Sequence, residues 1–199
     1  MRNLVIVAAV AVVAACSVAA LSASPAASSI AAEDVEKILN QAESQAKKEP
    51  SLLRVSADGK KQPTRMHIVV VDRGGRVIGQ RSMPDAWVGS ISIARAKAYT
   101  ALAFSSDENA LTTRSIYPLT QPGGPLWNIG NSNVNEGGLI EFPGGMPLYK
   151  DGKLVGGIGV SGDGVEEDEN VAEAGTKGFD APKAIRVDTV TNNGVPYTK

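Results

Sequence analysis

The sequence predicts an α+β fold, with helices flanking a five-stranded antiparallel sheet in a single domain. Apolar residues recur at helical spacing near the start, the middle and the end of the chain. The segments between them contain short β-rich runs separated by turns of hairpin length. About 170 residues follow the N-terminal leader, which is enough for one core but not for two ordinary domains.

Residues 1–23 have the layout of an export signal, because an apolar run, Leu4–Ala15, is followed by small residues. The run is too short and too rich in alanine to predict a membrane span. Two alternatives for the cleavage site remain open. The small residues of Ala20–Ala26 suit an ordinary signal peptidase, whereas Val13–Cys16 resembles a bacterial lipobox, in which the cysteine is acylated. We therefore expect an exported, periplasmic or extracellular protein, attached to a membrane only if Cys16 carries lipid.

The composition excludes several classes of function. Cys16 is the one cysteine of the chain, so the exported domain has no disulfide and no thiolate metal site. A hydrophobic content of 43% and a charged content of 21% are typical of globular proteins. The formal net charge is −1 and no basic stripe occurs, so we do not expect a nucleic-acid partner.

The first half of the domain alternates helix and hairpin signals. A helix is predicted over residues 33–48, ended by Pro50, and its apolar stripe consists of Val35, Ile38, Leu39, Ala42 and Ala46. The polar segment from Leu52 to Thr64 predicts a loop or a small hairpin. Two strands, Met66–Val71 and Arg76–Met83, then flank a short glycine-containing turn.

A second helix, Ser90–Phe104, has a face made mostly of alanine, so it can lie very close to a sheet. Residues 111–137 follow as a long loop, longer than compact domains usually tolerate without a functional reason.

Glycine is dense from Gly123 to Gly164, where it marks turns and close approaches of backbones. The three remaining strands and the third helix are expected at Leu139–Phe142, Met146–Tyr149, Leu154–Val160 and, for the helix, Val165–Lys177. The tail, Pro182–Lys199, alternates in polarity and predicts an edge strand or an arm onto a neighbouring subunit.

Several motifs, in the same order, resemble those of the GlcG/HbpS family, whose domain is also found at the C-terminus of some corrinoid adenosyltransferases. In the first half these are an apolar strand, Asp72–Gly75, a second strand, and the helix motif Ala94–Ala101 (ARAKAYTA). In the second half they are Phe142–Leu148 (FPGGMPL), the hairpin Gly152–Gly162 and the acidic helix that follows it.

The resemblance covers about residues 33–178 and leaves 179–199 as a C-terminal extension. It implies a profilin-like fold, homo-oligomers such as rings or octamers, and haem or a related tetrapyrrole as ligand. It also implies that the glycines of residues 142–162 let the alanine-faced helix approach the sheet. Residues 50–64, residues 116–137 and the tail depart from the family pattern.

Three residues of the second helix are candidates for ligand binding. Lys97 is a charged residue among alanines on the face expected to pack on the sheet, and a buried lysine requires a partner. An anionic ligand or a salt bridge to Asp72 or Asp85 meets that requirement equally well. Arg95 is a second cation for an anionic ligand, and Thr100 lies one turn beyond Lys97, although a threonine inside a helix often bonds to its own backbone.

His67 is the one histidine and is a candidate haem ligand, although a structural role is the more common one for such a residue. Glu166 and Glu169 belong to an acidic cluster that is a weak candidate for a metal ion, since acids at a helix start usually complement the helix dipole. No nucleophile–base arrangement occurs, so catalytic residues are not identified.

Two functions remain open. The first is an exported, oligomeric haem- or tetrapyrrole-binding protein that scavenges haem, protects against it or weakly degrades it. The second is an enzyme or accessory protein that acts on a small anionic organic metabolite in the same pocket.

Overall fold

The computed structural model describes residues 29–131, 138–192 and 194–199. The predicted export signal of residues 1–23, including Cys16, lies outside the described residues, and so does the part of the expected long loop at 132–137. Among the described helices, none is long and apolar enough to cross a membrane.

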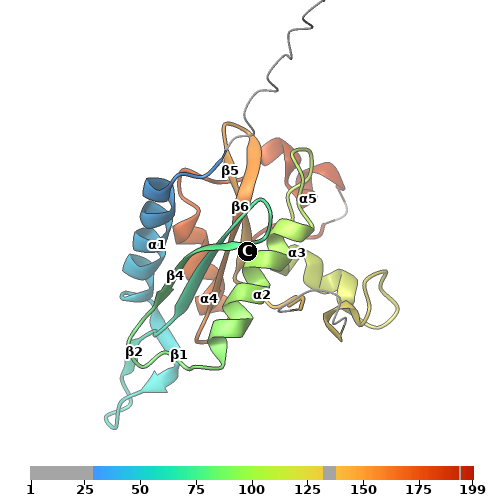
Figure 1. Cartoon of the computed structure of the whole chain (residues 1–199). Helices are drawn as coiled ribbons and strands as arrows, with labels where there is room; N and C mark the ends of the chain where they lie inside the picture. Colours follow the sequence, from blue (N-terminus) through green and yellow to red (C-terminus); the bar gives the residue numbers. More distant parts are fainter. Residues whose placement is uncertain (1–28, 132–137, 193) are drawn as a thin grey trace, which may run out of the picture.

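A four-stranded antiparallel sheet forms the centre of the domain (Figure 1). Across the sheet, the strands are β4 (Val77–Ser82), β3 (His67–Asp72), β6 (Lys153–Ser161) and β5 (Gly145–Lys150). Each pair that is consecutive in sequence is a hairpin, as the turn residues predicted. The α+β class is therefore confirmed.

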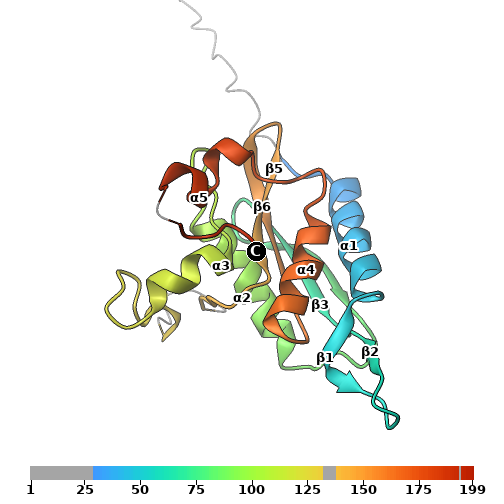
Figure 2. The ribbon, with the colours of Figure 1, turned by 180° about the vertical axis from the view of Figure 1, so that it is seen from behind.

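Helices cover both faces of this sheet, as the two views in Figures 1 and 2 show. Helices α1 (Ala32–Ala46) and α4 (Val165–Gly175) pack on one face, and α2 (Ser90–Ala103) packs on the other. Side chains alternate along β3, so Ile68 and Val70 join the core under α1 whereas Val69 and Val71 join the core under α2.

The expected fifth strand, Leu139–Phe142, is wrong, because this segment lies outside the sheet. The amide of Ile140 donates to the hydroxyl of Thr100 on α2, at 2.9 Å, instead of to a neighbouring strand. Pro143 follows and has no N–H with which to continue a strand ladder. The segment is a connection tied to the helix.

Helix α2 lies so close to β6 that the strand has no room for side chains there. A Cβ at Gly157 would lie 2.4 Å from the carbonyl oxygen of Ala98, and a Cβ at Gly159 would lie 2.0 Å from that of Ala94. Alanine on the helix and glycine on the strand together set this spacing, which confirms the expected close approach.

The segment predicted as a loop or small hairpin is a hairpin. Strands β1 (Pro50–Val55) and β2 (Lys61–Pro63) form a separate two-stranded sheet that extends beyond the central one at the lower left of Figure 1. Gly59 has φ +82°, which suits the turn. The carboxylate of Asp163 accepts from the Ser51 hydroxyl and, at 2.6 Å, from the Leu52 amide, so it anchors the hairpin to the body.

Short helices occupy part of the expected long loop and of the tail. They are α3 (Thr113–Ile116), η1 (Tyr117–Thr120), η2 (Ile129–Asn131), η3 (Lys183–Ile185) and α5 (Val187–Val190). The segment from η1 to η2 projects from the body at the right of Figure 1.

The tail does not form an edge strand, because η3 and α5 lie in it and neither sheet includes it. Its described residues pack on the body of the same chain. Ala110 and Arg186 form a single bridge, and Tyr197 is 5% exposed in the core under α2.

Candidate functional site

His67, the first residue of β3, is held by hydrogen bonds on both ring nitrogens and is only 4% exposed. Its Nδ1 lies 2.8 Å from the Ser82 hydroxyl, and its Nε2 lies 2.9 Å from the Trp87 carbonyl oxygen. Because a carbonyl oxygen only accepts, we assign the proton to Nε2 and let Nδ1 accept from Ser82. These two bonds fix the tautomer and the orientation of the ring.

Arg95 extends from α2 to the edge strand β4. Its Nε and Nη2 donate to Gln80 Oε1 at 3.2 and 2.8 Å. Gln80 Nε2 in turn donates to the Ser82 hydroxyl at 3.3 Å. A continuous chain of hydrogen bonds therefore joins Arg95 to His67. We call His67, Gln80, Ser82, Trp87 and Arg95 the β4 site.

Sheet register explains why these residues meet. His67 pairs directly with Ser82 across the β3–β4 ladder, and Gln80 lies two residues before Ser82 on the same face of β4. That face is the one against which α2 packs, so a side chain near the start of α2 reaches it. Two of the four predicted binding residues, His67 and Arg95, are thereby brought into one network.

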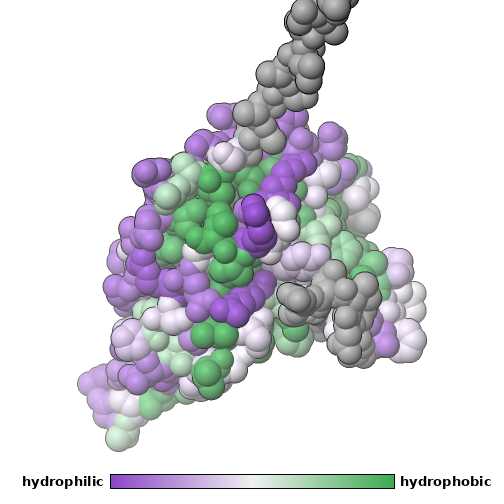
Figure 3. Space-filling model, viewed as in Figure 1, coloured by the Kyte–Doolittle hydropathy of each residue, from purple (hydrophilic) through white to green (hydrophobic). Residues whose placement is uncertain are grey.

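Exposed apolar side chains surround the β4 site. Ile78 is 40% exposed on the same face of β4, and Trp87 and Val88, which precede α2, are 49% and 84% exposed. Figure 3 shows apolar side chains gathered on the face turned to the viewer, where Figure 1 places the edge strand β4. An imidazole, a guanidinium and apolar surface together suit a flat, amphipathic, anionic ligand.

Lys97 lies on another side of α2, buried in an ion pair. Its Nζ donates to Asp168 Oδ2 at 2.7 Å and to the Val160 carbonyl oxygen at 3.0 Å, and its side chain is 1% exposed. Gly144 closes over the pair, since a Cβ there would lie 3.1 Å from Nζ. The geometry favours the salt-bridge alternative, with Asp168 as the partner.

Neither Asp72 nor Asp85 pairs with Lys97, so the prediction of these two salt-bridge partners is wrong. Asp72 accepts from Arg76 within its own turn, and the backbone carbonyl of Asp85 accepts from Arg54. The Lys97–Asp168 pair joins α2 to α4, and neither the period of a helix nor the spacing of a hairpin predicts which acid lies opposite. Burial lowers the pKa of Lys97 and raises the pKa of Asp168 to about 6, although the opposite charge of each group counters the shift of the other.

Thr100 lies on α2 beneath residues 139–142, the connection that precedes β5. Its hydroxyl donates to the Ala96 carbonyl oxygen at 2.7 Å and accepts from the Ile140 amide. This bond to its own helix is the ordinary role of a threonine inside a helix. Lys97 and Thr100 are thus not part of the β4 site.

The two glutamates proposed for a metal are engaged in charge pairs. Glu169 accepts from Arg114 Nε at 3.0 Å and from the Gly144 amide at 2.7 Å. Glu166 pairs with Arg114 at 2.9 Å and with Lys199 at 2.6 Å. In the described part of the chain, no group of three or more His, Cys, Asp or Glu residues is arranged to hold a metal ion.

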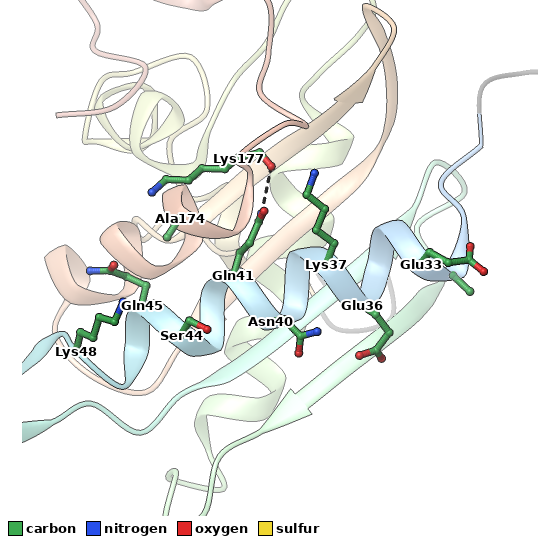
Figure 4. Close-up of a pocket in the computed structure, with 11 residues that line it drawn as sticks. Glu33, Glu36, Lys37, Asn40, Gln41, Ser44, Gln45, Lys48, Ala174 and Lys177 are labelled. Carbon is green, nitrogen blue, oxygen red and sulfur yellow. Dashed lines mark hydrogen bonds between the residues drawn. The ribbon is translucent and has the colours of Figure 1, made fainter.

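A shallow groove of about 860 Å³ follows the outer face of α1 (Figure 4). Polar side chains line it, and Gln41 donates to the Lys177 carbonyl oxygen at 3.1 Å, across the helix pair. None of the predicted binding residues lines this groove. Because the residues that we propose for binding lie elsewhere, we do not place the site there.

Sequence reasoning missed three members of the β4 site: Gln80, Ser82 and Trp87. Gln80 and Ser82 alternate with Gly79 and Arg81 on β4, which is a signal for a shared face. Nothing in the sequence indicates that the Trp87 carbonyl lies over His67, because the loop between β4 and α2 sets that contact.

The sequence model of the HbpS-like haem degrading proteins matches residues 30–177, and the chain belongs to this family. An uncharacterized 15.0 kDa protein encoded between dhaT and dhaS in Citrobacter freundii is 38% identical over 104 residues, which cover 52% of this chain and 68% of that protein.

The corrinoid adenosyltransferase PduO of the same organism is 36% identical over 106 residues, which cover 53% of this chain. The match spans only 30% of PduO, so it concerns one part of that enzyme. A crystal structure of the PduOC:heme complex has a TM-score of 0.63 at 25% identity and covers 78% of this chain and 98% of its own.

Proposed function

We propose that this protein binds haem or a related tetrapyrrole at the β4 site. Membership of the HbpS-like family and similarity to the haem complex of PduOC support the class of ligand. The observation that carries the location is the hydrogen-bonded chain from Arg95 to His67, which lies beside exposed apolar side chains.

The chemistry of these residues fits the parts of a haem. Ile78, Trp87 and Val88 offer apolar surface to the flat ring. Arg95 forms no salt bridge within the described ranges, and an exposed guanidinium without an acid partner suits a propionate carboxylate. His67 would supply the nitrogen ligand to iron, and the bound haem would supply a redox-active metal centre.

We also propose that the protein is exported and oligomeric, and that it scavenges haem or protects against it. The export signal pattern of residues 1–23 supports a periplasmic or extracellular location, with a lipid on Cys16 as one of the two cleavage outcomes. Resemblance to the GlcG/HbpS family supports a homo-oligomer.

A small anionic organic metabolite is the second candidate ligand. The same observation favours it, because Arg95 presents a guanidinium whose contact in the β4 site is the neutral amide of Gln80. A carboxylate would bind there without using His67. In that case the protein would act as an enzyme or accessory protein on the metabolite.

A hemin titration tests the proposal and separates the two candidates. The wild-type protein should shift the Soret band at micromolar concentration. Arg95→Ala should weaken hemin binding about fivefold, which corresponds to ~1 kcal/mol for an exposed ion pair. Lys61→Ala, an exposed cation on the β1–β2 hairpin, is the matched control and should leave binding unchanged.

The absence of a Soret shift in the wild-type protein would exclude haem. If small carboxylates then release heat in calorimetry with the wild-type protein but not with Arg95→Ala, the metabolite proposal is supported instead.

A further inference from the structure

One arginine connects the β1–β2 hairpin to the loop that covers His67. Arg54, on β1, lies over the ring of Trp87, with its guanidinium carbon 5.5 Å from the ring centroid. Its Nη2 donates to the carbonyl oxygen of Asp85 at 2.5 Å. Both contacts fall on residues 83–89, which we call the Trp87 loop.

The Trp87 loop is what occupies the Nε2 side of His67. The Trp87 carbonyl oxygen accepts from His67 Nε2 at 2.9 Å and from the Ser90 amide at 2.9 Å. At the start of the loop, the Met83 amide donates to the Met66 carbonyl oxygen at 3.0 Å, and the bond from the Ala86 amide to the Met83 carbonyl oxygen is local. Besides His67 itself, Arg54 is a side chain that reaches the middle of this loop, Asp85 and Trp87, from a different part of the fold.

Two features show that the closed loop is held at a free-energy cost. Asp85 has φ +61°, a left-handed conformation that non-glycine residues adopt with difficulty. Arg54 Nε is buried and has no hydrogen-bond partner among the described residues. An element held closed at a free-energy cost opens more readily than the core around it.

Ligation of iron through Nε2 of His67 requires this loop to move. A nitrogen binds a metal through its lone pair, and the Trp87 carbonyl and the Ser82 hydroxyl engage both ring nitrogens of His67. Trp87 and Val88, 49% and 84% exposed, stand on the outer side of the same loop. A ligand that packs on these two side chains therefore contacts the Trp87 loop, which must move before iron can bind Nε2.

We propose that Arg54 is a positioning residue that holds the Trp87 loop closed over His67, so that the imidazole becomes available only when the loop opens. The role of His67 toward iron rests on the proposed function. The closure itself does not, because it concerns only the access of a reagent to the ring.

Diethyl pyrocarbonate tests the closure without haem. The reagent acylates an accessible neutral imidazole, and the chain contains a single histidine, so the imidazole signal reports His67 alone. We expect slow modification of the wild-type protein. Arg54→Ala should react about tenfold faster, which corresponds to ~1.4 kcal/mol in the opening equilibrium.

Two further variants keep the test specific. Arg54→Lys retains the charge near Trp87 but loses the planar guanidinium, so its rate should fall between those of wild type and Arg54→Ala. Lys61→Ala, on the neighbouring strand of the same hairpin, should react at the wild-type rate. The proposal is overturned if Arg54→Ala reacts no faster than wild type, or if Lys61→Ala accelerates the reaction as much.

A hemin titration of the same variants separates this inference from the proposed function. If Arg54→Ala exposes His67 to the reagent and hemin also binds this variant faster than wild type, both the loop closure and the proposed haem binding are supported. If the reagent reacts faster while the Soret band never shifts in any variant, the closure stands and haem binding fails.

Discussion

Lys97 and Asp168 place two opposite charges in the interior, 1% and 3% exposed, with Nζ and Oδ2 2.7 Å apart. Removing one member leaves the other charge buried without compensation. Lys97→Met should therefore destabilise the protein by about 3–5 kcal/mol in urea unfolding. The exposed Lys61→Met should change stability by less than about 0.5 kcal/mol.

The result for Lys97→Met also decides the role of the lysine. If the variant unfolds at the wild-type urea concentration but no longer binds hemin, Lys97 serves the ligand and the ion-pair account is wrong.

Asp168 gives the stability an unusual pH dependence. Burial raises its pKa to about 6, above the value of 3.8 for the free side chain. The native state then holds a proton that the unfolded state has lost, so this carboxyl contributes stability at low pH that disappears as the pH rises through 6. Between pH 5 and 7 the loss should be about 1 kcal/mol.

Asp168→Asn should reduce that slope in urea unfolding measured across the same pH range, and the part that remains belongs to groups such as Glu169, whose pKa burial also raises. Above pH 6 the variant is less stable, because Lys97 loses its ionised partner there, but the comparison concerns the slope alone. An unchanged slope in the variant would show that another group titrates there.

At the scale of elements, the contact between α2 and β6 depends on the absence of side chains. Gly159→Ala would place a Cβ 2.0 Å from the Ala94 carbonyl oxygen, so the helix must shift. We expect a loss of about 2–3 kcal/mol in thermal or urea unfolding. Gly89→Ala is the matched control, since a Cβ there meets nothing within 4 Å. Equal effects of the two substitutions would contradict the close approach.

The tail is a structural element in its own right. Tyr197 is 5% exposed, its ring lies 4.9 Å from the Arg186 guanidinium carbon, and its carbonyl oxygen accepts from Thr112 at 2.6 Å. Tyr197→Ala should cost about 3 kcal/mol of stability in urea unfolding. Tyr117→Ala, at a residue 45% exposed, should have little effect. A tolerated Tyr197→Ala would mean that the tail contributes nothing to the fold.

At the scale of the whole molecule, local patterns predicted most elements and the close packing of α2. The period of its apolar residues predicts the stripe of α1, and the alanines of α2 predict its flat face. The role of the β6 glycines in the close approach follows from the resemblance to the GlcG/HbpS family. The strand at residues 139–142 was wrong because a hydroxyl on α2, that of Thr100, takes the Ile140 amide. Such long-range contacts leave no periodic signal in the sequence.

The candidate site was harder to predict for the same reason. His67 and Arg95 stood out by residue type, but the sequence did not show that β4 would join them through Gln80 and Ser82. Lys97 drew attention as a charge among alanines, and its partner Asp168 lies 71 positions away on another helix. The identity of the partners of a buried charge is a property of the whole fold.

The central claim is that His67 and the β4 site receive haem, and parallel hemin titrations of the wild-type protein and His67→Ala test it most directly. The account predicts a shifted Soret band with the ligation signature of an imidazole in the wild-type protein. In His67→Ala it predicts loss of that signature and at least tenfold weaker binding. Identical spectra and affinities for the two proteins would contradict it.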